Sequence, residues 1–69
     1  MENSVRLTGR EVAVLRLIAR GCTYSQAAAA LDMSANTVGT HVKNAYQKLD
    51  VHSAAAAVVR AIQLGLLEV

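Results

Sequence analysis

The stretch from Thr23 to Leu49, TYSQAAAALDMSANTVGTHVKNAYQKL, determines the fold that we expect for this chain. Its apolar spacing predicts a short helix over Tyr24–Leu31 and a longer helix over Ala35–Leu49, with a tight turn at Leu31–Ser34 between them. Two helices joined by so few residues must cross steeply. The stretch therefore predicts a helix-turn-helix.

The longer helix has two chemically different faces, because successive helical residues are rotated by about 100°. The apolar face, which we expect to be buried, contains Val38, Val42, Ala45 and Leu49. The opposite face contains Asn36, Thr40, Lys43 and Gln47. Side chains of these types reach base edges and phosphates in a major groove that admits one helix. A polar stripe alone is usually just a solvated face, and it is the combination with the helix-turn-helix that favours DNA binding.

Capping signals predict four helices in a compact all-α domain. A hydroxyl residue precedes each predicted helix, in order Thr8, Thr23, Ser34 and Ser53. Glu11 and Gln26 complete capping boxes for the first two helices. The first helix is expected over about Gly9–Arg20 and the fourth over about Ala54–Leu64, ended by Gly21 and Gly65.

Composition limits the possibilities without assigning a function. The 69 residues allow one domain, which we place at 7–69, behind a flexible entry or linker remnant at 1–6. The net charge of +2 permits nucleic-acid binding but does not establish it. No apolar run is long enough to span a bilayer and no leader is evident, so we expect a cytoplasmic, nucleoid-associated protein with no membrane partner.

No catalytic, cofactor, metal or small-molecule site is evident in the sequence. Cys22, the single cysteine, cannot form an intrachain disulfide or a thiolate zinc site by itself. It is expected to fill space, the alternative being a reactive exposed thiol. His41 is expected to be packed or hydrogen-bonded between helices, and His52 to be solvated or a local cap. Paired carboxylates, a phosphate loop and a nucleophile elbow are absent from the sequence, so we do not expect an enzyme.

The fourth predicted helix is apolar on nearly every side, which is typical of a helix with two packing partners. One partner would be the domain's own core, contacted through residues such as Val58 and Ile62. The other would be the same helix of a second copy in a homodimer. We assign that contact to Ala56, Val59, Arg60 and Gln63. Alternatively, Leu64, Leu66 and Leu67 fold back over the core and the alanines are simply exposed.

Motifs along nearly the whole chain resemble the LuxR-type (GerE-like) helix-turn-helix domain. The most specific are Leu7-Thr8-Gly9-Arg10-Glu11 and the later run of Ser34, Thr37, Val38 and His41. Such domains lie at the C-terminus of NarL/FixJ-class response regulators and related bacterial regulators. The resemblance implies a third helix in the major groove of double-stranded DNA and a fourth that forms a homodimer. The chain would be the output fragment of a longer regulator or a free-standing member.

The resemblance also implies site residues. Thr37, Gly39, Thr40 and Lys43 fall where the family contacts DNA from the third helix. Thr23 and Ser34 lie at helix starts, where hydroxyl and N–H groups bind phosphates; the free N–H groups expected at 35–37 either do so or face water. Lys48 is a flanking contact or a stem packed over the core. With Tyr24, Asn36 and Gln47, these residues complete the predicted DNA-binding set.

The chain departs from the family pattern at three positions. Gly39 stands where the family often has Lys, which removes a basic side chain and adds a flexible point to the helix. Ala54 stands where Arg is common, so an ion pair between that position and Glu11 cannot form. Tyr24 replaces a usual Asn, and its hydroxyl either hydrogen-bonds a phosphate or its ring lies flat on the end of the first helix.

Two functions are consistent with these residues. The first is sequence-specific binding of double-stranded DNA in transcription regulation. The second is a protein-interaction or dimerisation module that keeps the fold with weak or lost DNA binding, which Gly39 and the modest charge would explain.

Overall fold

The computed structural model describes residues 5–68, and these residues contain four α-helices and no β-strand. The helices are α1 (Gly9–Ala19), α2 (Tyr24–Leu31), α3 (Ala35–Leu49) and α4 (Ala54–Gln63). The predicted all-α fold and the helix-turn-helix are confirmed. α1 and α4 each end one residue before the expected position, because Arg20 and Leu64 are the C-cap residues.

Side-chain caps set the start of every helix. Thr8 and Glu11 form a reciprocal capping box on α1, in which the Glu11 amide donates to Thr8 Oγ1 at 3.1 Å and the Thr8 amide to Glu11 Oε1 at 2.9 Å. Thr23 and Gln26 form the equivalent box on α2. Ser34 and Ser53 cap α3 and α4 by accepting from the third amide of each helix. Because these bonds are local, the helix starts follow directly from the sequence.

The exits from the helices use left-handed backbone. Gly21 (φ 91°) and Gly65 (φ 75°) adopt it after α1 and α4, as the sequence predicts. Asp32 (φ 56°) and Asp50 (φ 57°) adopt it after α2 and α3. Aspartate is among the few non-glycine residues that enter this region readily, and both turns that flank α3 therefore end a helix without a glycine.

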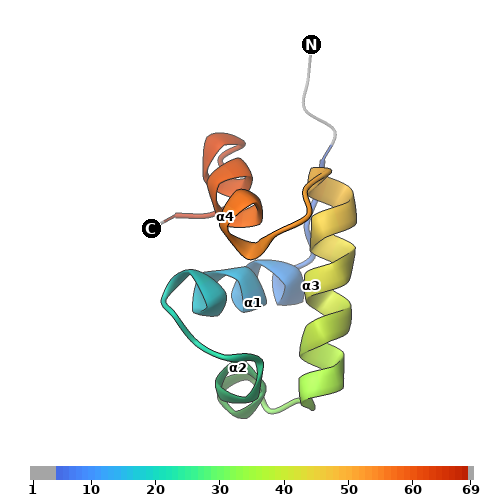
Figure 1. The fold of residues 1–69 in the computed structure, drawn as a ribbon, viewed down its shortest axis with the longest axis vertical. Helices are drawn as coiled ribbons and strands as arrows, with labels where there is room; N and C mark the ends of the chain where they lie inside the picture. Colours follow the sequence, from blue (N-terminus) through green and yellow to red (C-terminus); the bar gives the residue numbers. More distant parts are fainter. Residues whose placement is uncertain (1–4, 69) are drawn as a thin grey trace.

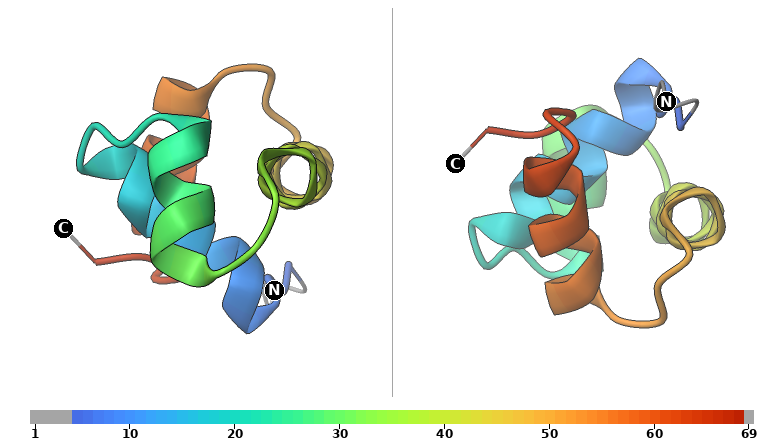
Figure 2. Two further views of the ribbon diagram at one scale, coloured as in Figure 1. Left: turned by 90° about the horizontal axis from the view of Figure 1, so that it is seen from below. Right: turned by 90° about the horizontal axis from the view of Figure 1, so that it is seen from above.

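The helices enclose a core with two parts, on either side of α1. In Figure 1, α1 lies in the middle with its N-terminal end beside α3, while α2 lies below it and α4 above. Between α1, α2 and α3 lie Val14, Ala27, Ala28, Val38 and Val42. Between α1, α3, α4 and the C-terminal segment lie Leu15, Ala45, Leu49, Ala57, Ala61 and Leu67. Seen along its axis in Figure 2, α3 stands at one side of the molecule, so only one of its faces contributes to this core.

The buried face of α4 differs from the prediction. Ala57 and Ala61 are fully buried, whereas Val58 is half-buried and Ile62 is 37% exposed. Small side chains let the α4 backbone approach its neighbours closely, and the larger ones are then displaced toward solvent. Val58 does pack against the core, but the expectation that Ile62 is a core residue is wrong.

The chain ends fall partly outside the described residues. Of the entry segment predicted at 1–6, residues 1–4 are not described, and Val5 is half-buried against the Leu15 part of the core. Leu67 is buried, and Leu64 and Leu66 pack against the same part. The C-terminal leucines therefore do fold over the core, as the alternative for α4 requires, and Ala55 and Ala56 are exposed.

Candidate nucleic-acid interface

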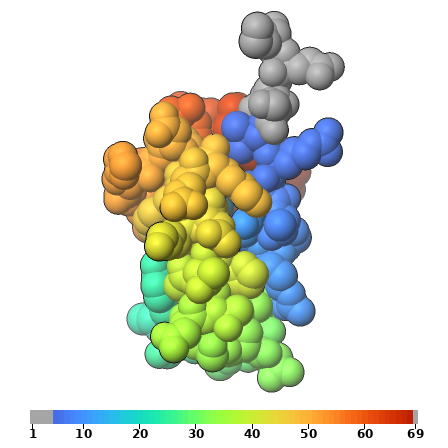
Figure 3. Space-filling view, turned by 90° about the vertical axis from the view of Figure 1, so that its right-hand side faces the viewer, coloured from blue at the N-terminus to red at the C-terminus, as the bar shows by residue number. Residues whose placement is uncertain are grey.

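The outer face of α3 is exposed to solvent. Asn36, Thr40, Lys43 and Gln47, which we call the outer stripe, are all exposed. The opposite residues, Val38, Val42, Ala45 and Leu49, are all buried. Figure 3 looks onto this side of the molecule, and the yellow-green surface of α3 crosses it without being covered by another described segment. The predicted division of α3 into a core face and a solvent face is confirmed.

Several hydroxyl groups near the outer stripe are already hydrogen-bonded within the domain. Thr40 Oγ1 donates to the Asn36 carbonyl at 3.1 Å, which leaves the oxygen lone pairs free to accept. Ser34 Oγ and Thr37 Oγ1 lie 2.9 Å apart, and the Thr37 amide donates to Ser34 Oγ. The Thr37 amide is therefore not free, contrary to expectation, and at the start of α3 only the amides of Ala35 and Asn36 lack a partner among residues 5–68.

The start of α2 lies beside α3. Thr23 is exposed, and both its amide and its hydroxyl take part in the capping box with Gln26. Tyr24 is 43% exposed, and its Cε2 atom would lie 3.8 Å from a Cβ atom on Gly39. The Tyr24 ring therefore lies beside α3 at Gly39. Gly39 causes no break, since α3 is continuous from Ala35 to Leu49.

Lys48 joins α3 to α1 through a buried carboxylate. Its Nζ atom lies 2.8 Å from Oε1 of Glu11, a residue only 2% exposed. Burial tends to raise the pKa of Glu11, but the hydrogen bonds from Lys48 and the Thr8 amide and the charges of Lys48 and His41 outweigh it and lower this pKa. Ala54 supplies no cation to Glu11, as expected. Lys48, on α3, supplies the cation instead. The Lys48 ammonium is thus held by the domain itself.

Lys43 is the cation of the outer stripe. Among residues 5–68 the Lys48–Glu11 contact is the one ion pair, so the Lys43 ammonium is not neutralised by a neighbouring carboxylate. Beside it, a hollow of about 480 Å³ separates α3 from the turn that follows. Its lining residues are Lys43, Tyr46, Gln47, Asp50, Val51 and His52. His52 is exposed, consistent with the solvated position expected for it, and His41 is half-buried.

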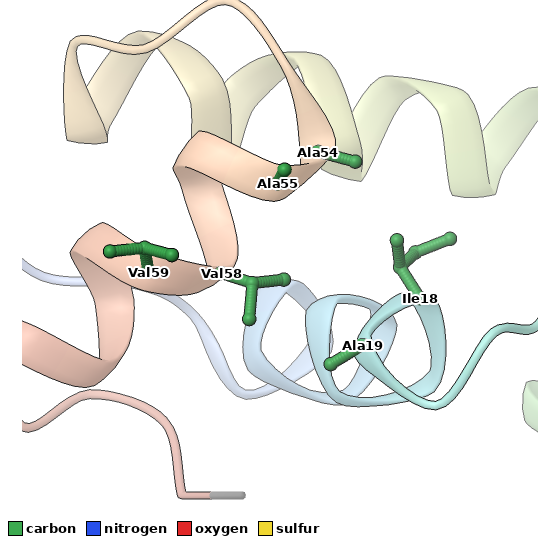
Figure 4. Close-up of a pocket in the computed structure, with 6 residues that line it drawn as sticks. All are labelled: Ile18, Ala19, Ala54, Ala55, Val58 and Val59. Carbon is green, nitrogen blue, oxygen red and sulfur yellow. The ribbon is translucent and has the colours of Figure 1, made fainter.

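α4 presents a different kind of surface. All the residues predicted for dimerisation, Ala56, Val59, Arg60 and Gln63, are exposed. A groove of about 330 Å³ runs between the end of α1 and the start of α4 (Figure 4), lined by Ile18, Ala19, Ala54, Ala55, Val58 and Val59. These side chains are all aliphatic, so the α1–α4 surface offers apolar contact where the outer stripe offers hydrogen bonds.

Within residues 5–68, no His, Cys, Asp and Glu side chains cluster as a metal site would require. Nor does any helix in the described part of the chain have the length and apolarity needed to cross a membrane. Cys22 is half-buried and forms no disulfide.

Comparison with known proteins places this geometry in a family. Residues 5–61 match the family described as bacterial regulatory proteins, luxR family. A nitrate/nitrite response regulator protein homolog of Haemophilus influenzae is 51% identical over 53 residues, which cover 77% of this chain and 26% of that protein. The HTH-type transcriptional regulator MalT of Klebsiella pneumoniae is 48% identical over 58 residues, 84% of this chain and 6% of that protein.

The fold is also similar to that of a known regulator. A solved structure of the transcription factor GerE superimposes with a TM-score of 0.86 and 33% identity, covering 96% of this chain and 97% of that one. By contrast, the chain spans only about a quarter of the Haemophilus relative and a small part of MalT. With its helix-turn-helix, its uncovered third helix and a family match across most of its length, the chain belongs to the LuxR family of bacterial regulatory proteins.

Proposed function

We propose that this chain is a sequence-specific DNA-binding domain of a bacterial transcription regulator, a binding module without catalytic function, and that α3 enters the major groove of double-stranded DNA. The observation that carries the proposal is the outer stripe of α3. Its four polar side chains are exposed together on one helix face that no other described segment covers. Amide, hydroxyl and ammonium groups spaced along one helix match the donors and acceptors displayed by base edges.

The roles of individual residues follow from their positions. Asn36, Thr40, Lys43 and Gln47 face the bases, while Thr37 and Gly39 flank them. Thr23, Tyr24 and Ser34, near the starts of α2 and α3, contact phosphates together with the free amides of Ala35 and Asn36. We assign Lys48 an indirect part, because its ammonium is bound to Glu11 and holds α3 in place.

Dimerisation on DNA is the second element of the proposal. A single small module buries only about 600–1,000 Å² on DNA, so one copy binds weakly. An isologous contact between two α4 helices, through Ala56, Val59, Arg60 and Gln63, would join two copies on a pair of half-sites. Because the DNA of a bacterium lies in its cytoplasm, the proposal places the protein there, as an output domain of a longer regulator or as a free-standing member.

A second function, a protein-interaction module with weak or lost DNA binding, is favoured by the apolar α1–α4 groove and by the glycine at position 39. Amide chemical shifts recorded during titration with duplex DNA separate the two. Changes at 36–47 support DNA binding, whereas unchanged shifts there, with self-association through 56–63, support the interaction module.

Lys43→Ala is the direct test of the outer stripe. A duplex is first selected from a random pool by the unmodified domain, and the dissociation constant is then measured over a series of salt concentrations. Lys43→Ala should weaken binding about tenfold or more and lower the salt slope by about one unit, because one phosphate or guanine contact is lost. Arg16→Ala, which removes an exposed cation from α1, is the matched control and should have a small effect. Equal effects of the two substitutions would contradict the assignment of the outer stripe.

A further inference from the structure

Gly39 and Tyr24 meet at the edge of the outer stripe. Gly39 is half-buried in the second turn of α3, and a Cβ atom there would be in ordinary van der Waals contact with Tyr24 Cε2, at 3.8 Å. The backbone does not require a glycine, since Gly39 is not among the residues with positive φ. Position 39 thus has room for a methyl group, and the nearest atom outside α3 that such a group would meet belongs to the tyrosine ring. The ring therefore lies over the position from which a longer side chain would start.

The phenol of Tyr24 is available to an external partner. The residue is 43% exposed, and its hydroxyl makes no hydrogen bond within residues 5–68. Its ring lies beside Gly39, whose neighbour Thr40 belongs to the outer stripe. Lys43, the cation of the outer stripe, follows Gly39 by about one turn of α3. Tyr24 therefore adds an aromatic ring and a hydroxyl to the same surface.

Tyr46 is a second tyrosine, on α3. It lies two turns after Gly39 on the same side of α3 and is half-buried. Burial raises the pKa of the Tyr46 phenol, and repulsion from the ionised form of Tyr24 raises this pKa further.

We propose that Tyr24 and Gly39 act as one DNA-contacting unit, in which the tyrosine of α2 supplies the side chain that position 39 of α3 lacks and donates its hydroxyl proton to a DNA phosphate. The unit sets which side chain stands next to Thr40 and Lys43 at the protein–DNA surface. This inference rests on the proposed function, because it assumes that the outer stripe faces DNA. It adds that the contact made by Tyr24 depends on the absence of a side chain at position 39 of α3.

Tyr24→Phe tests the hydroxyl alone. Binding is measured with the duplex selected by the unmodified domain, over the same salt series. Loss of a hydrogen bond to a charged group should weaken binding about tenfold. The salt slope should stay unchanged, because a neutral hydroxyl releases no counterion. Tyr46→Phe removes the same atom from a half-buried neighbour and is the matched control, expected to change affinity by less than about twofold.

A double-mutant cycle tests the pairing of the two positions. Gly39→Ala should be tolerated, because the methyl group fits beside the ring. Gly39→Lys should displace the ring and weaken binding, whereas in a Tyr24→Ala background the same lysine has room to extend and should weaken binding far less. We expect the effect of the lysine to differ between the two backgrounds by about fivefold or more. Thermal unfolding verifies that each variant is folded, and if Gly39→Lys is not, Tyr24→Phe remains decisive.

The outcomes separate the two proposals. If Tyr24→Phe binds like the unmodified domain, or if the substitutions in the cycle act independently, the Tyr24–Gly39 unit is overturned while DNA binding by the outer stripe stands. If the unmodified domain selects no duplex at all, both proposals are overturned.

Discussion

The outer faces of α3 and α4 are both exposed, but they expose opposite kinds of chemistry. α3 presents the amides, hydroxyl and ammonium of the outer stripe. α4 presents Val59, 54% exposed, and Ile62, 37% exposed, next to an aliphatic groove. A hydrated groove rich in donors and acceptors suits the first surface, and a second apolar protein surface suits the second. The difference teaches that the two proposed contacts, with DNA and with a second copy, fall on different helices of one small domain.

Placing a charge on α4 should have the largest effect on self-association and on DNA affinity. If it had none, the assignment of different contacts to α3 and α4 would be wrong. Val59→Asp places a carboxylate in the proposed α4–α4 contact, so we expect it to abolish self-association. Apparent affinity for a duplex with two half-sites should fall by about a hundredfold, because two linked contacts become one. Affinity for a single half-site should hardly change. Sedimentation and duplex binding measure the two quantities.

Two controls accompany that substitution. Val59 is exposed, so its replacement should alter the free energy of unfolding by no more than about 0.5 kcal/mol. Ala29→Asp puts the same charge on an exposed position of α2 and should leave sedimentation unchanged. Undiminished self-association of Val59→Asp would show that α4 is not the contact between copies.

Removing the charge of Glu11 should have the next largest effect, on stability and on DNA binding. It tests α3 separately from α4. Glu11→Gln leaves Lys48 without its anionic partner, and we expect a loss of roughly 1–2 kcal/mol of stability at neutral pH. This is less than for a fully buried pair, because the Lys48 side chain is 38% exposed. Because α4 takes no part in the pair, single-site DNA binding should suffer more than self-association.

The pH dependence of that effect has a definite sign. The pKa of Glu11 is lower in the folded domain than its ordinary value of 4.5, so the folded state favours the ionised carboxylate. The contribution is present in full above that ordinary value and is lost as pH falls through the lowered pKa. Urea unfolding of the unmodified domain and Glu11→Gln should therefore converge in acid. Glu68→Gln, at an exposed acid, should show no such convergence, and a constant difference across the pH range would rule out the ion pair as the cause.

Gly39→Ala should have the smallest effect. It tests how the glycine in α3 limits the stability of that helix compared with the alanine-rich α4. α4 is built largely of alanine, the best helix former, whereas α3 carries a glycine in its second turn. Alanine fits at position 39, so the free energy of unfolding should rise by up to about 1 kcal/mol. Thermal unfolding measures it, with Gly9→Ala at the first position of α1 as a control of smaller effect. A destabilised Gly39→Ala would mean that the methyl group does not fit beside Tyr24.

Local chemistry made most of the fold predictable from the sequence. The hydroxyl caps identified every helix start, since each cap bonds an amide only three residues ahead. The two faces of α3 were also predicted, because its apolar and polar residues segregate cleanly. In α4 the same reasoning misplaced Ile62, since a helix that is apolar nearly all round has no clear pattern to show which side is buried. There close backbone approach at Ala57 and Ala61 outweighed side-chain size.

Contacts between distant parts of the chain were not predictable. Lys48 and Glu11 are 37 positions apart, and only the crossing of α1 and α3 brings them together. The contact of Tyr24 with Gly39 depends in the same way on how α2 crosses α3. The left-handed aspartates after α2 and α3 carried a weaker signal than the glycines after α1 and α4, because aspartate usually adopts ordinary backbone.

The clean division of α3 has a consequence for how new binding preferences arise. The outer-stripe residues belong to neither part of the hydrophobic core, and Val38, Val42, Ala45 and Leu49 are at most 3% exposed. Substitutions in the outer stripe should therefore leave folding intact. Evolution, or a randomised library, can then vary the binding preference at these positions without having to restore stability each time.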